Sequence, residues 1–322
     1  MKSIRRKMLG RVDVLFRSLI SGLLLTVLTC SQGLLIAATK RSGTTYSYST
    51  VSANLTVECV KLIFSFVTLQ WVRRKNGDSS ATRLRISPRR LVLYPIPAAL
   101  YLIKNLLQYV IFIFVEAPSY QILKNLNVLT TAVLYSVLLN KHISKLEWCS
   151  LLLLSIGCVV SQLRDNSSAV FQLSSVGLIL SLVMALLSSF AGVYTEKIMK
   201  GDASIDINVQ NFYLYVFGVL FNSLAYFVTS NSPSQSRIKF FSGYTPLVWL
   251  MISNHAFSGI VVSYVLRFGN NLTKVRATSL AVALTTLMSV IFLDYKLQIQ
   301  FLLGFLIVAI SLYIPTLENK GG

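Results

Sequence analysis

The sequence predicts an all-α membrane protein with ten transmembrane helices. Three observations lead to this fold class: an apolar composition, ten apolar segments of membrane-spanning length, and an uneven distribution of Lys and Arg between them. Hydrophobic residues make up 54% of the 322-residue chain, and charged residues only 13%. Soluble domains carry about 25% charged residues, so this composition is typical of a protein that lies in a bilayer.

The apolar segments are long enough to cross the hydrocarbon core, which takes about 17 to 25 residues of helix. The first follows the basic residues 1–16 and has no clear small-residue cleavage site, so we expect a retained span rather than a cleaved signal peptide. Residues 316–322 form a short tail. The ten segments are 17–39, 49–71, 91–115, 119–139, 146–163, 174–199, 208–229, 246–266, 273–293 and 298–315.

The Lys and Arg residues lie mainly on one side of these segments. When residues at the span ends are counted with the adjoining loops, 21 of the 30 fall on the side of the N-terminus and six on the opposite side, and the other three, Lys61, Lys104 and Lys124, lie within the spans. Leaving out Lys274 and Arg276 as possible pocket residues still gives 19 against six. The positive-inside rule then places both termini in the cytosol, which agrees with an even number of spans. The net charge of +19 is explained by this orientation, and we expect no nucleic-acid partner.

A weak internal repeat relates the two halves of the chain. Leu129-Thr-Thr131 recurs 155 residues later as Leu284-Thr-Thr286, and each copy is followed by an apolar stretch, a lysine and another span. Because each half contains five spans, the second half would enter the membrane in the opposite orientation. This pattern predicts two inverted five-helix repeats, residues 17–165 and 166–315, with substrate bound between the halves.

A polar stripe interrupts the apolar fourth span. Tyr120, Lys124, Asn127 and Thr131 are spaced i, i+4, i+7 and i+11, so they share one helix face. The ninth span repeats the spacing from Lys274 onward. A lysine inside a membrane helix costs about 2.5 kcal/mol or more unless it faces water or a partner. The stripe therefore indicates a cavity lining, with helix–helix hydrogen bonding as the alternative.

The buried charges suggest an anionic ligand. Lys124 and Lys274 have no obvious intramembrane carboxylate, and a phosphate carries enough charge for both. Glu58 and Lys61 are three residues apart and can neutralise each other, either as a structural pair or as one that also touches ligand. Arg276 lies about 200° around the helix from Lys274, so we expect it at the cytosolic surface. Other polar groups at depth are Asn105, Ser188, Asn211, Tyr215 and Asn254.

The sequence contains no recognisable catalytic centre. The two histidines, His142 and His255, form no metalloprotease motif, and no nucleophile-elbow, phosphate-loop or paired-cysteine motif occurs. The four cysteines all lie in apolar stretches and do not form a metal-ligand cluster. We therefore predict that the protein is not an enzyme and uses neither a metal nor a cofactor, and we interpret His255 as a bundle histidine.

Several segments resemble the nucleotide-sugar transporter family. They are Ser119-Tyr-Gln-Ile-Leu-Lys-Asn-Leu126, Ser188-Ser-Phe-Ala-Gly-Val-Tyr-Thr-Glu-Lys197, Gln210-Asn211 with Tyr215 and Gly218, Asn271-Leu-Thr-Lys274, Thr29-Cys-Ser-Gln-Gly33 and Glu58-Cys-Val-Lys61. The resemblance covers nearly the whole chain. Within this family, the chain is similar to the branch that contains CMP-sialic acid and UDP-galactose transporters, including the plant members.

The resemblance implies ten helices in the drug/metabolite transporter fold, in the Golgi membrane. It also implies exchange of a cytosolic nucleotide sugar for a lumenal nucleoside monophosphate. When the family's binding residues are carried over by position, Lys274 would bind phosphate. The residues that would hold the nucleoside and the nearby phosphate are Asn105, Tyr120, Ser188, Asn211 and Tyr215. Glu58, Lys61 and Gly192 are supporting positions in the same motifs.

Two departures from the family pattern affect this assignment. The family often has Asn-Asn in span three, where this chain has Asn105-Leu106. The family lysine that follows Asn-Leu in span four is Asn127 here. Lys124 lies one turn earlier on the same face, and we expect it to supply the missing charge. The substrate-binding residues expected are Asn105, Tyr120, Lys124, Asn127, Ser188, Asn211, Tyr215 and Lys274.

The sequence therefore predicts an alternating-access antiporter for a CMP- or UDP-linked sugar, a multi-pass protein surrounded by membrane lipid. Two alternatives stay open: a transporter of another phosphorylated metabolite, and a non-transporting membrane scaffold for glycosylation. The sugar, the choice between CMP and UDP, and the oligomeric state are not fixed by these residues.

Overall fold

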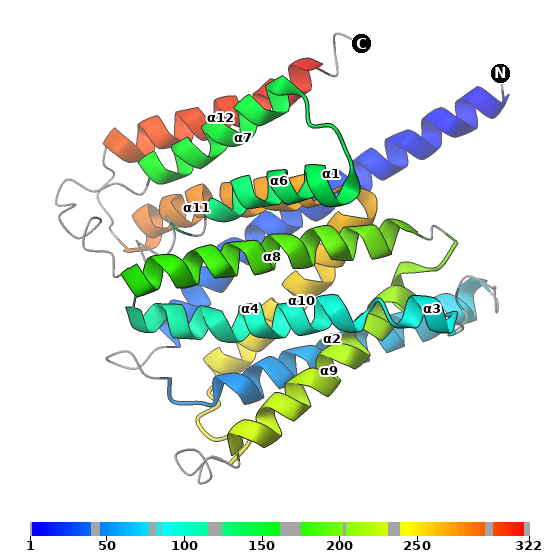
Figure 1. Ribbon diagram of the computed structural model, residues 1–322, viewed down its shortest axis with the longest axis vertical. Helices are drawn as coiled ribbons and strands as arrows, with labels where there is room; N and C mark the ends of the chain where they lie inside the picture. Colours follow the sequence, from blue (N-terminus) through cyan, green and yellow to red (C-terminus); the bar gives the residue numbers. More distant parts are fainter. Residues whose placement is uncertain are drawn as a thin grey trace. The chain divides into compact units, whose positions relative to one another are not determined.

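A computed structural model of the chain describes residues 2–39, 46–76, 82, 84, 86–114, 123, 125–161, 175–201, 204–230, 239–293 and 299–318. These residues form helices joined by short connections, without a β-strand among them (Figure 1). Tyr120 and Lys124 of the predicted stripe lie outside the described residues.

Within the described residues, a long helix overlaps each of the ten predicted segments, and a four-residue helix, α3, precedes the long helix of the third segment. Within the described residues, five helical stretches are long and apolar enough to cross a membrane: Thr50–Lys75, Pro88–Gln108, Ser175–Gly201, Ile207–Ser230 and Pro246–Phe268. The chain is therefore a multi-pass membrane protein, and ten crossings stay a prediction. The helices are α1 (Lys2–Ala38), α2 (Thr50–Asn76), α3 (Pro88–Leu91), α4 (Pro95–Phe114), α6 (Leu126–Leu139), α7 (Lys145–Val160), α8 (Ser175–Gly201), α9 (Ile207–Ser230), α10 (Pro246–Phe268), α11 (Asn271–Leu293) and α12 (Ile299–Glu318).

Two helix boundaries differ from the sequence prediction. Helix α1 begins at Lys2, so the basic segment 1–16, predicted as a separate terminus, continues the first helix. Its Arg, Lys, Leu and Met residues have high helix propensity, and no proline interrupts it. The predicted span 91–115 begins at the last residue of α3, and after a turn over residues 92–94 its helix, α4, starts at Pro95. Proline disfavours a helical residue before it but is well accommodated in a first helical turn.

The helices present an apolar outer surface. Large side chains such as Val137, Leu250 and Leu306 are more than half exposed, as expected for groups that contact lipid. Hydroxyl groups on these helices hydrogen-bond to their own backbone: Thr68 Oγ1 donates to the carbonyl of Phe64 at 2.8 Å. This pairing satisfies a polar group where no water is available.

The chain forms two compact units. Unit 1 comprises Met1–Leu106 and Tyr194–Asn270, and unit 2 comprises Leu107–Val193 and Asn271–Gly322. Each unit therefore takes helices from both halves of the sequence, so the units are not the predicted repeats. The repeats, 17–165 and 166–315, describe a relation within the sequence, and they stay a prediction.

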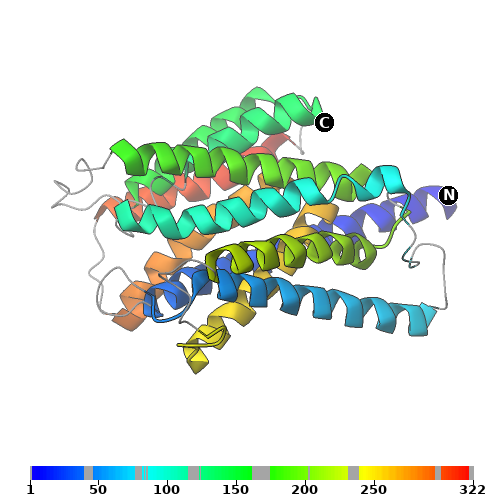
Figure 2. The same cartoon turned by 60° about the horizontal axis from the view of Figure 1, so that its bottom comes forward.

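Unit 1 is built on the pairing of α2 with α9 and of α1 with α10. Figure 2 shows α2 and α9 side by side. The hydroxyl of Ser65 on α2 donates to the backbone carbonyl of Asn208, in the first turn of α9, at 2.9 Å. Apolar residues from α2 and α10, including Val57 and Ile252, form a buried core beside these contacts. This packing fixes the polar faces of α2, α9 and α10 described below.

Unit 2 is built on the close packing of α7 against α12, which lie side by side in Figure 1. Two glycines permit this approach. A Cβ atom on Gly157 would lie 2.9 Å from the backbone nitrogen of Val308, and one on Gly304 would lie 2.6 Å from the carbonyl oxygen of Gly157. Small residues at helix crossings of this kind are a common means of association in membranes. Helix α11 packs against α6 in the same unit.

Candidate functional site

Unit 1 contains a buried ion pair on α2 that also contacts α9. The Lys61 Nζ lies 2.6 Å from Glu58 Oε1, and the side chains of these two residues are 12% and 9% exposed. The same Nζ lies 4.6 Å from the centroid of the Tyr215 ring, within cation–π range. The predicted neutralisation of Glu58 by Lys61 is therefore confirmed, and Tyr215 is brought to the same place.

Two glycines leave room for this pair. A Cβ atom on Gly218 of α9 would lie 2.5 Å from Glu58 Oε2, and one on Gly259 of α10 would lie 2.9 Å from Lys61 Cδ. Any larger residue at either position would displace a charged side chain from its present place. Gly218 belongs to one of the family motifs found in the sequence. Gly259 could not be identified from the sequence, because its role depends on Lys61, on a helix distant in sequence.

The polar face of α9 continues beyond Tyr215. Asn211 lies one turn earlier on the same face, is 2% exposed, and its Oδ1 has no hydrogen-bond partner among the described residues. A buried acceptor without a donor is costly and calls for a ligand, a water molecule or an ion. The ligand-binding role of Asn211 stays a prediction.

Helix α4 contributes a third polar face to unit 1. Tyr101 lies on this helix, one turn before Asn105. One turn further along, the Lys104 Nζ donates a hydrogen bond of 3.3 Å to Asn105 Oδ1. The predicted site residue Asn105 thus has a lysine as its immediate neighbour. Sequence reasoning assigned no role to Tyr101 or Lys104, although Tyr101 shares a helix face with Asn105.

His255 on α10 has a hydrogen-bond partner within unit 1. Its Nδ1 lies 3.0 Å from Gln32 Nε2 on α1, and the neighbouring Asn254 donates from Nδ2 to Ser31 Oγ at 2.5 Å. These contacts tie α10 to α1. The interpretation of His255 as a satisfied bundle histidine agrees with this geometry.

Unit 2 carries the buried lysine of α11. Lys274 is 7% exposed, and its Nζ lies against Gly192 of α8, where an added Cβ atom would come within 2.5 Å. The Oδ1 of Asn271, at the start of α11, would lie at the same 2.5 Å distance from that atom. Ser188 lies one turn before Gly192 on α8. The structure thus brings Gly192 and Lys274 together and places Ser188 on the same helix face.

Asn127 forms part of a hydrogen-bond network between α6 and α8. Its Oδ1 accepts a hydrogen bond of 2.7 Å from Ser189 and one of 3.3 Å from Thr131. Thr130 also lies within 2.7 Å of the Ser189 hydroxyl. Asn127 and Thr131, the stripe residues within the described part of the chain, therefore connect α6 to α8. Hydrogen bonding between helices was the alternative to a cavity lining that the sequence left open.

Arg276 points to a different partner from Lys274. Its Nη2 lies 3.5 Å from Glu147 Oε1, in the first turn of α7. That turn is capped by Ser144, whose hydroxyl accepts a hydrogen bond of 3.1 Å from the backbone nitrogen of Glu147. Arg276 therefore has a carboxylate partner on α7, and its expected position at the cytosolic surface stays a prediction.

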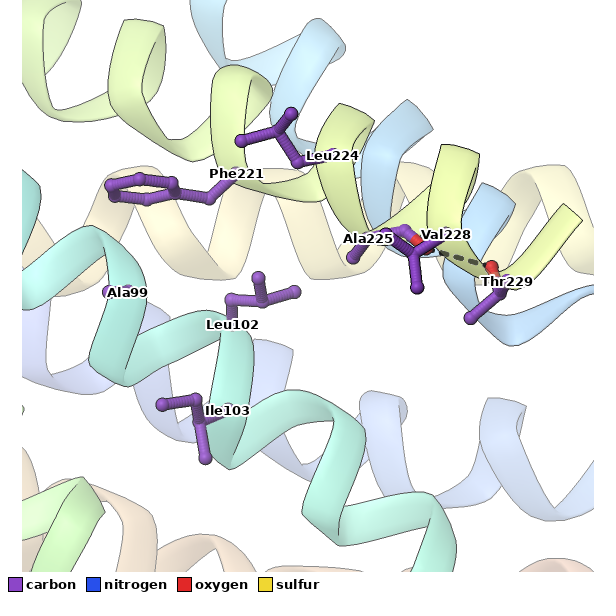
Figure 3. A pocket seen from close by; sticks show the side chains of 8 residues that line it. All are labelled: Ala99, Leu102, Ile103, Phe221, Leu224, Ala225, Val228 and Thr229. Carbon is purple, nitrogen blue, oxygen red and sulfur yellow. Dashed lines mark hydrogen bonds between the residues drawn. The ribbon is translucent and has the colours of Figure 1, made fainter. Parts of the chain in front are cut away.

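A groove of about 440 Å³ lies between α4 and α9 of unit 1, but its lining does not suit a charged ligand. Figure 3 shows side chains from both helices around it, and only the threonine hydroxyl offers a polar side-chain group. The candidate site is therefore the set of buried polar side chains and not this groove. The lining residues are Ala99, Leu102, Ile103, Phe221, Leu224, Ala225, Val228 and Thr229.

Comparisons with known proteins place the chain in a family. The family model described as nucleotide-sugar transporter matches residues 15–316. The chain is 46% identical over 292 residues to CMP-sialic acid transporter 2 of Oryza sativa subsp. indica, covering 91% of this chain and 82% of the relative. It is also 46% identical over 290 residues to CMP-sialic acid transporter 4 of Arabidopsis thaliana, covering 90% of this chain and 82% of that one.

A solved crystal structure shares the fold at 14% identity, with a TM-score of 0.67 over 94% of this chain and 97% of that one. The relatives are named as transporters, which confirms the prediction that the protein is not an enzyme. Their identity over most of the chain also confirms the resemblance seen in the motifs. The chain belongs to the nucleotide-sugar transporter family.

Proposed function

We propose that the protein is an alternating-access antiporter that exchanges a cytosolic pyrimidine nucleotide sugar, CMP- or UDP-linked, for a lumenal nucleoside monophosphate. The observation that carries the proposal is the placement of Lys274, a buried membrane lysine with a glycine that makes room for its ammonium group. A lysine at this depth is costly unless it serves a partner or a ligand. The names of the relatives support a CMP-linked sugar as the first candidate.

Lys274 is suited to bind phosphate. It lies in the first turn of α11, which begins at Asn271. The positive end of the helix dipole favours an anion at such a position, in addition to the lysine charge. We assign the phosphate to Lys274, with Gly192 preserving the space and Ser188 nearby on α8.

The polar cluster of unit 1 is suited to a nucleoside. Asn105 and Asn211 offer amide groups that can pair with the edge of a base, and Tyr215 offers an aromatic ring. Glu58 and Lys61 hold Tyr215 in place and contribute charge. Tyr120 stays assigned to the ligand by the family resemblance, and Lys124 by its position one turn before Asn127 on the same helix face.

The helix pairings support the predicted inverted repeat. Under that repeat, α2 corresponds to α9, α6 to α11 and α7 to α12, and each of these pairs packs together within its unit. Mutual contact of equivalent helices is expected when two repeats are related by a pseudo-two-fold axis. The distribution of Lys and Arg supports cytosolic termini, and the family resemblance supports the Golgi membrane.

Obligate exchange follows from the buried charges. An empty carrier would have to reorient with lysines that no ligand neutralises, which is costly in a low-dielectric environment. A carrier with a bound nucleotide carries less uncompensated charge and can reorient in either direction. No ion gradient is then required, because either ligand permits the return step.

Competition for uptake tests the substrate class. Purified protein in proteoliposomes should take up a labelled CMP- or UDP-linked sugar, and CMP or UMP should inhibit this uptake more strongly than AMP or GMP. Inhibition by sugar phosphates without effect of any nucleotide would instead favour transport of another phosphorylated metabolite. Absence of uptake by folded protein, together with full rescue of glycosylation by Lys274→Ala, would favour the scaffold alternative.

A further inference from the structure

We propose that the groove between α4 and α9 binds the acyl chain of a membrane phospholipid. This site is separate from the polar residues assigned to the nucleotide, and the inference does not depend on which substrate is transported. Three observations support it: the groove lies between membrane helices of one unit, its lining is apolar, and it opens toward the outer surface of that unit.

Both walls of the groove are membrane helices of unit 1. The lining comes from residues 99–103 of α4 and 221–229 of α9, and both segments belong to stretches that are long and apolar enough to cross a membrane. The two helices meet near the start of α4, where the ring centroid of Tyr94 lies 6.0 Å from that of Tyr213. Further along, Leu102 points from α4 toward α9 across the groove (Figure 3). The groove is therefore the space left where α4 and α9 no longer pack closely.

The lining suits an apolar ligand. Within the described part of the chain it contains no charged side chain. Its one hydroxyl group, that of Thr229, donates to the backbone carbonyls of Ala225 at 2.9 Å and Tyr226 at 3.0 Å, so it needs no ligand. The volume of about 440 Å³ lies within the range of about 300 to 1,000 Å³ that is common for small-molecule sites. An apolar cavity of this kind stays dry and takes up apolar molecules.

The groove opens toward the surface that contacts lipid. Leu224 and Val228 of its α9 wall are more than half exposed. Helix α9 has 24 residues and is about 36 Å long, so its last turn lies at the edge of a hydrocarbon core about 30 Å thick. The groove follows α9 from Phe221 to Thr229, over about 12 Å. An acyl chain therefore fits along α9 with its headgroup near Thr229, at the membrane interface.

A phospholipid chain is the occupant because the medium around these helices is the hydrocarbon of the bilayer. Empty space beside Leu102 and Phe221 would forfeit dispersion contacts, and the methylene groups of a chain restore them. The two walls also carry Asn105 and Asn211 of the predicted nucleotide site. A bound chain would thus brace the helices that hold these residues, and we expect its binding to stabilise the folded protein.

Photolabelling of the full-length wild-type protein locates the lipid. The protein in phosphatidylcholine liposomes would be irradiated with a trace of phosphatidylcholine that carries a diazirine in one acyl chain, and mass spectrometry would identify the labelled residues. We expect residues 99–103 and 221–229 to be labelled several-fold more than exposed apolar residues elsewhere, such as Leu250 and Leu306. Equal labelling of all exposed apolar residues would overturn the inference, because it would show contact with bulk lipid only.

Filling the groove tests the site by loss of binding. Ala99→Phe and Ala225→Phe place a ring in the groove from either wall, and Ala309→Phe is the matched control at an exposed position of α12. Phospholipid that stays with each purified protein in detergent would be measured by phosphate assay. We expect wild type and control to retain about one phospholipid per chain, and both groove variants to bind it about tenfold more weakly or worse.

Added phosphatidylcholine should also raise the unfolding temperature of wild type and Ala309→Phe more than that of the groove variants. Equal retention in all four proteins, whether high or absent, would overturn the inference. If a groove variant does not fold, photolabelling of the wild type decides. These measurements do not involve nucleotide uptake, so their failure would leave the proposed exchange function standing.

Discussion

The ammonium group of Lys274 occupies space that exists because residue 192 is a glycine: a Cβ atom there would come within 2.5 Å of the Lys274 Nζ. Two helices separated by about 80 residues in sequence thus meet at one charged atom. The relationship explains why residue 192 of α8 is a glycine, and it yields the first prediction.

Gly192→Ala should weaken nucleotide binding about tenfold or more, because the methyl group displaces Lys274 and Asn271 from their places. Titration with CMP and UMP measures the effect. Gly201→Ala is the matched control, since a Cβ atom on Gly201 would meet nothing within 4 Å. Equal loss in both variants would show that the site does not depend on the space at residue 192.

Removing one member of the Glu58–Lys61 pair should destabilise the protein more than removing both. Glu58→Gln leaves the Lys61 charge buried without its carboxylate, at a cost of about 3 to 5 kcal/mol, whereas Glu58→Gln with Lys61→Met leaves no such charge. Thermal unfolding in detergent measures the difference. Strictly additive losses in the double variant would contradict a coupled ion pair.

Asn127→Ala should lower stability, because Ser189 and Thr131 lose the acceptor that they share. We expect a loss of about 1 to 2 kcal/mol, measured as a lower unfolding temperature. Ser155→Ala is the control, since the Ser155 hydroxyl donates to a carbonyl of its own helix. If stability is unchanged but nucleotide affinity falls, Asn127 acts on the ligand instead, as the sequence predicted.

Gly157→Ala should separate α7 from α12, because the new methyl group would meet the backbone nitrogen of Val308 at 2.9 Å and the backbone carbonyl of Gly304 at 3.0 Å. We expect a cost of about 1 to 3 kcal/mol, typical of overpacking. The unfolding temperature measures this cost, again with Gly201→Ala for comparison. An unchanged unfolding temperature would mean that the two helices can move apart freely.

Local sequence patterns predicted most of the helices, because a span of apolar residues is a local property. The same holds for the Glu58–Lys61 pair, whose members are three residues apart on one helix. The roles of Gly192 and Gly259 could not be derived, since each depends on a side chain from a helix far away in sequence. The division into two units was also inaccessible, because helices of both sequence halves contribute to each.

The polar stripe of span four shows the limit of helical periodicity as evidence. Its spacing placed Asn127 and Thr131 on one face, and the structure confirms that they contact each other. Periodicity does not reveal what that face meets. For these two residues the partner is Ser189 of α8, so a polar stripe can serve helix packing as well as a ligand.

Trans-stimulation of uptake tests the central claim most directly. Proteoliposomes containing the protein would be preloaded with CMP, UMP, AMP, GMP or buffer, and initial uptake of labelled CMP- and UDP-linked sugars would be measured. Obligate exchange predicts that CMP or UMP inside the vesicles strongly accelerates uptake, while buffer-loaded vesicles take up little. Equal rates into empty and preloaded vesicles would contradict the exchange mechanism.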